Sequence, residues 1–594
     1  MIRTLLGLTL PALVPAAAAL TLALAPGRAD ACGGFFCDGG PQGMPVDQSG
    51  ENILFAFDGD TVEVHIQIAY DPNTDASKFS WVIPVTALPE FFVGSEVLFD
   101  NVLNGTVPFY GRNTVNEICG DSGFGTMGTT GTSTSGGSDS ATDGGTGDTG
   151  GPNVVYEATV GAFDVVVLEG GNTDEVVQWL NDNGYQQDPE AVPILDAYLK
   201  EGNLFAAFKL APAEKPVVHP IVLRYKGVEP CVPIRLTRIA AVEDMDIRVF
   251  FLGDHRAIPT NYRHVLVNPL KIDWPGLGAN YKEVVTAAVD AFKAEGNAFV
   301  TEYAGPSDVI PTFGLFDPGW DPKAFNGLWP TDVAAELQNQ GLLYCEDYGE
   351  VYCNYNHPLL LGLLLEHLPP PDGISPDEFY YCLSCYEGMI DLLQWGDGSG
   401  FANAFTDRIY NPGERALGLL QSKPYVTRMY TTISPHEMLE DPVFFENADL
   451  PPVDNTRIAQ RYIRCDGHAE YTLPDGRWVF IPNNGPWPDF PGEMPWEEET
   501  QQMAMAGPPQ VLNSNTALID QLLAEWNAQA APSATGGTET GSGSPTETSD
   551  ASATSGGQSG DDGGCGCTSD PGGGALASLA LFGLVGLAGR RRRA

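Results

Sequence analysis

An apolar segment that ends in four consecutive arginines limits what the rest of this chain can become. Residues 572–589 are apolar and rich in small side chains, and they are followed directly by Arg590, Arg591, Arg592 and Arg593. An apolar stretch of this length can cross the hydrocarbon core of a bilayer as a helix, whereas the arginines resist translocation and stay cytoplasmic. We therefore expect the main body to fold on the other side of a membrane.

The first residues of the chain match a secretory signal peptide. A positively charged start precedes an apolar core over residues 5–25, and the small residues Ala29 and Ala31 mark a cleavage site just before Cys32. We expect signal peptidase to remove residues 1–31. A retained membrane anchor is the alternative.

Two cysteines, Cys565 and Cys567, flank one glycine shortly before the apolar segment. This Cys-Gly-Cys sequence, the small-residue apolar helix and the arginines together resemble the MYXO-CTERM surface-sorting signal of myxobacteria-type Gram-negative bacteria. The resemblance implies that an intramembrane sorting protease cuts near the cysteines and leaves the body at the cell surface, held by lipid on Cys565 or Cys567. A tail that is kept as a plain membrane anchor remains the alternative.

The other nine of the 11 cysteines lie in the body. They are Cys32, Cys37, Cys119, Cys231, Cys345, Cys353, Cys382, Cys385 and Cys465. In an exported protein such residues are disulfide candidates, and their connectivity cannot be read from the sequence. Because nine is odd, at least one must stay free, pair with another chain or be modified. Cys32 is the natural leftover, either as a thiol or as a lipidated residue, and the other eight remain disulfide candidates.

Cys382 and Cys385 form a Cys-x-x-Cys pair, a spacing that also occurs in redox and zinc sites. Residues 376–393 carry apolar side chains at helical spacing after a Ser-Pro start, so we expect one helix with Cys382 facing a core. A second Cys-x-x-Cys pair is missing from the sequence. A structural disulfide is therefore favoured over zinc or thiol–disulfide chemistry.

Composition divides the chain into seven segments. These are the signal peptide (1–31), the first part of the body (32–122), an insertion rich in Gly, Ser and Thr (123–152), the second part of the body (153–310), a cysteine-containing region (311–530), a stalk (531–564) and the sorting tail (565–594). The insertion and the stalk hold too few apolar residues to offset the entropy of ordering, so we expect both to be disordered.

Hydrophobic periodicity predicts the secondary structure of the body. Strand patterns occur at residues 53–57, 62–70, 80–85, 158–168, 204–210, 217–225, 234–240, 247–252 and 298–303. Helix patterns occur at residues 174–183, 192–201, 281–294, 358–368 and 376–393. We expect an α+β fold, with a largely antiparallel sheet and packed helices in the N-terminal body and a disulfide-braced second half rich in helices and loops.

The start of the body resembles a bacterial family of unassigned activity. Three motifs carry this resemblance: Cys-Gly-Gly-Phe-Phe-Cys over residues 32–37, Pro-Val-Asp-Gln-Ser-Gly-Glu over residues 45–51 and Trp-Val-Ile-Pro-Val over residues 81–85. They are similar to motifs of the family known as domain of unknown function 2330. The resemblance extends to about residue 256. It implies secreted or surface-attached proteins and supplies no catalytic residues.

Short motifs give no active site. Residues 119–123 read Cys-Gly-Asp-Ser-Gly, which resembles the nucleophile segment of trypsin-like proteases, but Phe124 replaces the second glycine and no upstream Ala-His-Cys occurs. His436-Glu437 lacks the second histidine of a zincin helix. The sequence therefore predicts no catalytic residue, cofactor or metal ligand, and a glycosidase carboxylate pair stays open because its separation is spatial.

The charge of the chain excludes one class of partner. It carries 30 basic and 77 acidic residues, a formal net charge of −47, and such a surface repels nucleic acid and anionic membrane faces. We expect a protein anchored at the cell surface or outer membrane that is more readily a non-enzymatic module for an envelope or matrix ligand than an enzyme. A secreted hydrolase with an unrecognised active site is the alternative.

Overall fold

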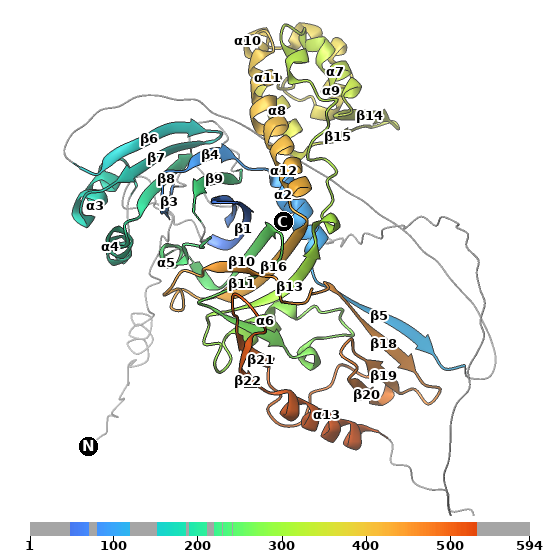
Figure 1. Ribbon diagram of the computed structural model, residues 1–594. Helices are drawn as coiled ribbons and strands as arrows, with labels where there is room; N and C mark the ends of the chain where they lie inside the picture. The colour runs from blue at the N-terminus through green and yellow to red at the C-terminus, as the bar shows by residue number, and fades with distance from the viewer. Residues whose placement is uncertain are drawn as a thin grey trace, which may run out of the picture. The chain divides into compact units, whose positions relative to one another are not determined.

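The computed structural model describes residues 48–70, 80–118, 151–185, 189–210, 219–227, 230–239 and 241–531 (Figure 1). They fall into two compact units, each described by itself below. The first holds the described parts of residues 1–112, 134–459 and 492–521, and the second those of residues 113–133, 460–491 and 522–594. The predicted signal peptide and sorting tail, and nearly all of the predicted insertion and stalk, lie outside the described residues.

A ten-stranded sheet is the largest element of the first unit. In order across the sheet its strands are β22 (Gln510–Ser514), β21 (Glu497–Gln502), β12 (Arg263–Val267), β13 (Ala298–Pro306), β16 (Tyr425–Ile433), β10 (Ala241–Gly253), β1 (Gln48–Asp58), β2 (Thr61–Tyr70), β9 (Ile221–Lys226) and β4 (Glu90–Val93). Neighbours are antiparallel except β1 with β10 and β12 with β13. The predicted α+β class with a largely antiparallel sheet is confirmed, and β16, β21 and β22 come from the half that was predicted to be rich in helices and loops.

The hairpin of β1 and β2 follows the predicted alternation of side chains. Gly59 takes a φ of 67° in its turn, a conformation that glycine adopts without strain. The apolar residues of β2 are buried on one face: Val62, Val64 and Ile66. On the other face His65 is buried as well, because helices α2 (Glu96–Thr106) and α12 (Asn411–Ser422) pack against that side of the sheet through a cluster that includes Leu54.

A four-stranded sheet packs face to face on the first. Its strands are, in order, β3 (Ser80–Val85), β8 (Leu204–Leu210), β7 (Phe163–Glu169) and β6 (Asn153–Val160). One apolar core contains residues from both sheets, and helices α3 (Thr173–Asp182) and α4 (Ala191–Glu201) cover the outer face of the smaller sheet. The two sheets therefore form a sandwich with helices on both outer faces.

Two predicted strands have a different structure. Residues 158–168 contain parts of β6 and β7, because Gly161 takes a φ of 58° and turns the chain between them. A side chain is excluded there, since a Cβ on Gly161 would lie 2.2 Å from His219 Nε2. In the segment predicted as a strand over residues 234–240, Ile234–Thr237 form the short helix α5, after which the Arg238 amide donates to the Ile234 carbonyl at 2.9 Å.

The helix predicted over residues 281–294 is shorter than expected. It forms α6 (Tyr281–Val289), with Asp290 as its C-cap. The predicted last turn cannot be helical, because Lys293 takes a positive φ of 74°. Smaller elements complete this unit: η3 (Pro269–Lys271) and a ribbon of β11 (Arg256–Pro259) with β17 (Phe444–Asn447).

Residues 307–424, between β13 and β16, form a helical lobe with an apolar core of its own. Its elements are η4 (Ser307–Val309), η5 (Pro322–Phe325), η6 (Pro330–Asp332), α7 (Val333–Asn339), β14 (Leu343–Asp347), β15 (Val351–Tyr355), α8 (Pro358–His367), α9 (Pro376–Tyr381), η7 (Leu383–Met389), α10 (Leu392–Trp395), α11 (Ser399–Phe405), η8 (Thr406–Tyr410) and α12. Disulfides join Cys345 to Cys353 and Cys382 to Cys385. The prediction of a disulfide-braced second half is thus confirmed.

The prediction of a single helix over residues 376–393 is wrong. The segment divides into α9, η7 and α10, because Cys382 has φ −139° and ψ 67°, values outside the helical region. This break changes the direction of the following side chains. Cys382 is only half-buried and Cys385 is exposed, so the pair does not face the core as predicted.

The second unit is a small mixed sheet with the end of one helix. The sheet has the order β20 (Trp478–Ile481), β19 (Ala469–Thr472), β18 (Thr456–Ile463) and β5 (Phe109–Asn116), of which β18 and β5 begin in the first unit. The pairs β18–β19 and β19–β20 are antiparallel, whereas the bonds from the Phe109 amide to the Asn455 carbonyl and from the Glu117 amide to the Ile463 carbonyl show that β5 runs parallel to β18. Helix α13 (Thr516–Ala530) ends here, where Trp526 Nε1 donates to the Phe480 carbonyl at 2.8 Å. Cys465 is also disulfide-bonded.

Within the described ranges, no helix is both long and apolar enough to cross a bilayer. The segment predicted to do so, residues 572–589, lies outside those ranges.

Candidate functional site

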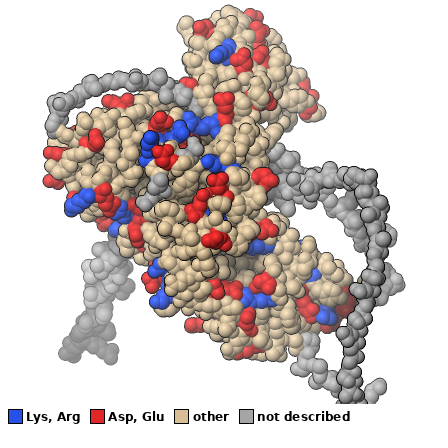
Figure 2. All heavy atoms as spheres, viewed as in Figure 1, with Lys and Arg blue, Asp and Glu red and all other residues tan. Residues whose placement is uncertain are grey.

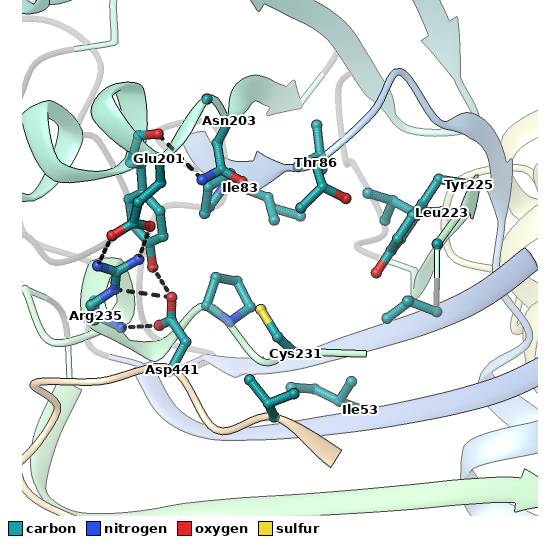
Figure 3. A pocket seen from close by; sticks show the side chains of 18 of the residues that line it. Ile53, Ile83, Thr86, Glu201, Asn203, Leu223, Tyr225, Cys231, Arg235 and Asp441 are labelled. Atoms are coloured by element: carbon teal, nitrogen blue, oxygen red, sulfur yellow. Dashed lines mark hydrogen bonds and ion pairs between the residues drawn. The ribbon is translucent and has the colours of Figure 1, made fainter. Parts of the chain in front are cut away.

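A cavity of about 630 Å³ in the first unit is lined by strands of both sheets (Figure 3). One side of it, called here the apolar wall, consists of Ile53, Val64, Ile66, Ile83, Val85 and Leu223. These residues come from β1, β2 and β9 of the large sheet and from β3 of the small one. Their side chains point between the sheets because alternate residues of a strand share one face.

The opposite side of the cavity is polar and is called here the polar wall: Tyr198, Glu201, Arg235 and Asp441. Asp441 accepts hydrogen bonds from the Tyr198 hydroxyl at 2.7 Å, from the Arg235 amide at 3.0 Å and from Arg235 Nε at 3.0 Å. The two terminal nitrogens of Arg235 donate to the two Glu201 oxygens at 2.8 and 2.6 Å. Figure 3 shows Glu201, Arg235 and Asp441 side by side. The Arg235 guanidinium also lies 4.0 Å from the centre of the Tyr198 ring.

Local sequence explains how each of these side chains is positioned. Tyr198 and Glu201 lie in the last turn of α4, and Gly202 ends that helix in the left-handed conformation at φ 87°. Arg235 lies in α5, a helix that begins directly after Pro233. Asp441 belongs to the segment after β16, which Asn261 holds through hydrogen bonds of 2.8 Å to the Asp441 carbonyl and from the Val443 amide.

The charges of the polar wall compensate one another. Burial raises the pKa of Asp441, and the hydrogen bonds from Arg235 and Tyr198 act against that rise. The hydrogen bonds from Arg235 lower the pKa of Glu201. Hydrogen bonding to Glu201 and the proximity of Asp441 raise the pKa of Arg235, so the guanidinium stays charged. Because Glu440 also lines the cavity, three acidic side chains and one basic side chain contribute to its lining.

Cys231 lies on the cavity wall, and its backbone bridges to Val443. Its sulfur is a thiol, so the prediction of a disulfide at Cys231 is corrected. Each of the other described cysteines is disulfide-bonded. None of the described residues that line the cavity is a histidine, the side chain that activates the thiol of cysteine hydrolases.

A second hydroxyl group borders the apolar wall. Tyr225, near the end of β9, lines the cavity, and burial raises its pKa well above the ordinary value. A neutral phenol can both donate and accept one hydrogen bond. Together with Asn203 and Thr86, which also line the cavity, it offers uncharged polar groups to a ligand.

Most residues singled out from the sequence lie elsewhere. Eleven of them lie outside the described residues: Ala29, Ala31, Cys32, Cys37, Cys119, Cys565, Cys567, Arg590, Arg591, Arg592 and Arg593. Cys345, Cys353, Cys382 and Cys385 brace the helical lobe. Over the described ranges, no group of three or more His, Cys, Asp or Glu side chains is arranged to hold a metal ion.

Sequence reasoning missed the polar wall. Tyr198, Arg235 and Asp441 belong to three separate segments, and none of them lies in a recognisable motif. The signal that was available is the run Pro230-Cys231-Val232-Pro233 before Arg235, because two prolines around a buried valine indicate a fixed, irregular segment beside the core.

Comparisons with known proteins give a family for part of the chain. No curated protein matches this chain. Among solved structures, the crystal structure of baculovirus P35 matches with 12% identity and a TM-score of 0.19, covering 38% of this chain and 75% of that one, a likeness too weak to carry an argument. Residues 26–312 match the family described as "Uncharacterized protein conserved in bacteria (DUF2330)". The match covers the whole apolar wall and all of the polar wall except Asp441, and the family it indicates is uncharacterised.

Proposed function

We propose that this protein is exported, is anchored at the bacterial cell surface through its C-terminal tail, and binds an apolar ligand whose polar end is neutral or cationic. The observation that carries this proposal is the cavity of about 630 Å³ between an apolar and a polar wall. Small-molecule sites of about 300–1,000 Å³ combine an apolar lining with a few fixed polar groups, as this cavity does.

The charge of the cavity supports the choice of ligand. Arg235 already makes a bidentate ion pair with Glu201 and a hydrogen bond to Asp441, so three of its five guanidinium N–H donors are used and its charge is balanced by carboxylates of the protein. With Glu440 added, the polar wall has an excess of negative charge. A carboxylate or sulfonate on the ligand would be repelled, whereas an amine, an amide or a hydroxyl group would be accepted.

Export is supported by the disulfides of the helical lobe and by the sequence at the two ends. The Cys345–Cys353 and Cys382–Cys385 bonds are typical of proteins that fold in an oxidising compartment. Signal peptidase would act before Cys32, and a tail-sorting intramembrane protease near Cys565 and Cys567. The membrane is then a partner through the tail alone, because the acidic body repels anionic lipid.

Binding is favoured over the alternative of a secreted hydrolase. A general acid or base must reach the substrate with its own proton or lone pair. Asp441 is buried and accepts three hydrogen bonds, and Glu201 is held by both terminal nitrogens of Arg235. These contacts stabilise the wall of a binding site and leave its carboxylates occupied.

A titration with N-phenyl-1-naphthylamine, a neutral apolar fluorophore, tests this function. We expect saturable fluorescence enhancement with the unmodified protein and its loss in Thr86→Trp, because Thr86 is an exposed residue on the cavity rim. Leu88→Trp is the matched control: it lies two residues away, is 47% exposed and does not line the cavity. Equal binding by both variants would refute the site. Turnover of a broad ester and glycoside panel that Thr86→Trp abolishes would favour the hydrolase.

A further inference from the structure

The helical lobe carries a short two-stranded ribbon, β14 and β15, that extends away from its helices (Figure 1). In the register of this ribbon Glu346 lies opposite Tyr352, and alternation puts Tyr344 and Glu346 on the same face. Tyr348 and Glu350 continue this face at the connecting turn. The tyrosine face is defined here as Tyr344, Glu346, Tyr348, Glu350 and Tyr352.

The three tyrosines of this face are strongly exposed. The exposed fractions are 56% for Tyr344, 77% for Tyr348 and 57% for Tyr352. Large aromatic side chains seldom gather on a surface that stays in water, and tyrosine is enriched where proteins meet other molecules. The tyrosine face is therefore a candidate interaction surface.

Hydrogen bonds order these side chains. The hydroxyls of Tyr344 and Tyr348 donate to the two oxygens of Glu346 at 2.7 and 2.6 Å, and the Tyr352 hydroxyl donates to Glu350 at 2.9 Å. The two bonds to Glu346 lower the pKa of that carboxyl, which keeps it ionised. The carboxylates therefore hold the aromatic rings in place before a partner binds. The tyrosine side chains would lose little conformational entropy on binding.

The opposite face fixes the ribbon to the lobe. The Cys345–Cys353 disulfide joins directly paired residues of the two strands. Tyr355 donates a hydrogen bond of 3.0 Å to Asp377 at the start of α9. The ribbon is therefore a braced support for the tyrosine face.

The charge of the ribbon selects the kind of partner. Residues 343–355 contain Glu346, Asp347 and Glu350 and no lysine, arginine or histidine. Figure 2 shows acidic side chains at the ribbon and no basic ones beside them on the visible side. Cations bind to the faces of tyrosine rings, and nearby carboxylates strengthen that attraction.

We propose that the tyrosine face docks a lysine- or arginine-bearing segment of a partner protein. The cationic groups would lie on the tyrosine rings and pair with Glu346 and Glu350, while their aliphatic stems cover aromatic surface. This inference is independent of the cavity, because no residue of the ribbon lines it.

The test uses the full-length protein and two fluorescent probes, decalysine and decaarginine, at physiological salt. Replacing Tyr344, Tyr348 and Tyr352 together by alanine leaves the net charge unchanged and should raise Kd at least about tenfold. The matched control replaces three equally exposed aromatic residues elsewhere, Phe292, Phe313 and Trp329, which are 69%, 60% and 51% exposed. The control should bind like the unmodified protein.

Each other outcome is decisive. Unchanged binding by the tyrosine variant, or an equal loss in the control, would overturn the proposal in favour of general attraction to an acidic protein. If the tyrosine variant loses its Cys345–Cys353 disulfide, the Glu346→Gln/Glu350→Gln variant decides instead: weaker binding supports the proposal and unchanged binding overturns it. Binding of chitosan oligomers without binding of either peptide would assign the face to a cationic polysaccharide and contradict a protein partner.

Discussion

The Tyr198 hydroxyl donates a hydrogen bond of 2.7 Å to Asp441, a residue 243 positions later in the chain. Tyr198 lies in the region that matches DUF2330, and Asp441 lies beyond its end at residue 312. The candidate site is thus completed by a segment outside the family match. A chain cut after residue 312 would lack one carboxylate of the polar wall.

Asp441→Asn should destabilise the first unit by about 3 kcal/mol, because a buried acceptor that holds Arg235 and Tyr198 is weakened. The shift of the urea unfolding midpoint measures this change. Glu440→Gln is the neighbouring control, since the Glu440 side chain is exposed, and it should leave the midpoint in place. Equal midpoints for both variants would contradict the role given to Asp441.

The buried pair of Arg428 and Glu302 should respond strongly to the loss of one partner. Both side chains are at most 5% exposed, and Glu302→Gln leaves the guanidinium beside an uncharged amide at a cost of about 3 kcal/mol. Thermal unfolding measures the loss. Asp196→Asn removes the partner of Lys200 in a solvent-exposed pair, and it should have no measurable effect.

His219 should make the fold sensitive to acid. Burial lowers its pKa from 6.5 to about 4, and its Nε2 accepts a hydrogen bond of 2.8 Å from the Ala162 amide. Between pH 6.5 and about 4 the unfolded chain therefore binds more protons than the folded one, so the free energy of unfolding falls as pH decreases through this range. The expected contribution of this residue over the range is about 3 kcal/mol.

Urea unfolding as a function of pH tests this dependence. His219→Gln keeps an acceptor for the Ala162 amide and should flatten the slope below pH 6.5 by one proton. Part of the slope should persist, because burial lowers the pKa of His264 to about 3 as well. An identical slope in the variant would show that His219 is not buried in its neutral form.

The sorting tail gives a separate prediction. Replacing Cys565 and Cys567 together by alanine should leave export intact and disturb processing of the tail, because the expected lipid-bearing thiols are removed. Mass spectrometry of the mature C-terminus and its lipid measures this effect. Thr568→Ala/Ser569→Ala is the adjacent control and should be processed normally. An unchanged terminus and lipid state in the cysteine variant would rule out the sorting hypothesis.

Local signals predicted those elements whose structure is decided locally. The turn at Gly59 and the alternation of Val62, Val64 and Ile66 gave the first hairpin, since both patterns lie within a few residues. The segment from Ile234 was assigned to a strand from its apolar residues. It is a helical turn because Asp441 binds the Arg235 amide and side chain, a contact that no local pattern contains.

The candidate site could be predicted only in part for the same reason. Cys231 was singled out as a cysteine, but its place on the cavity wall depends on the bridge to Val443. The polar wall joins α4, α5 and the segment after β16, which the sequence separates widely. The order of strands that brings them together is a property of the whole sheet.

The charge preference of the cavity is the most direct test of the account. N-phenyl-1-naphthylamine and 8-anilinonaphthalene-1-sulfonate share an aromatic skeleton and differ by one sulfonate, so parallel fluorescence titrations of the same protein isolate the effect of the anion. We predict saturable binding of the neutral probe that Thr86→Trp abolishes and at least about tenfold weaker binding of the sulfonate. Equal or tighter binding of the sulfonate would contradict the proposed ligand class, and no saturable binding of either probe would contradict the cavity as a binding site.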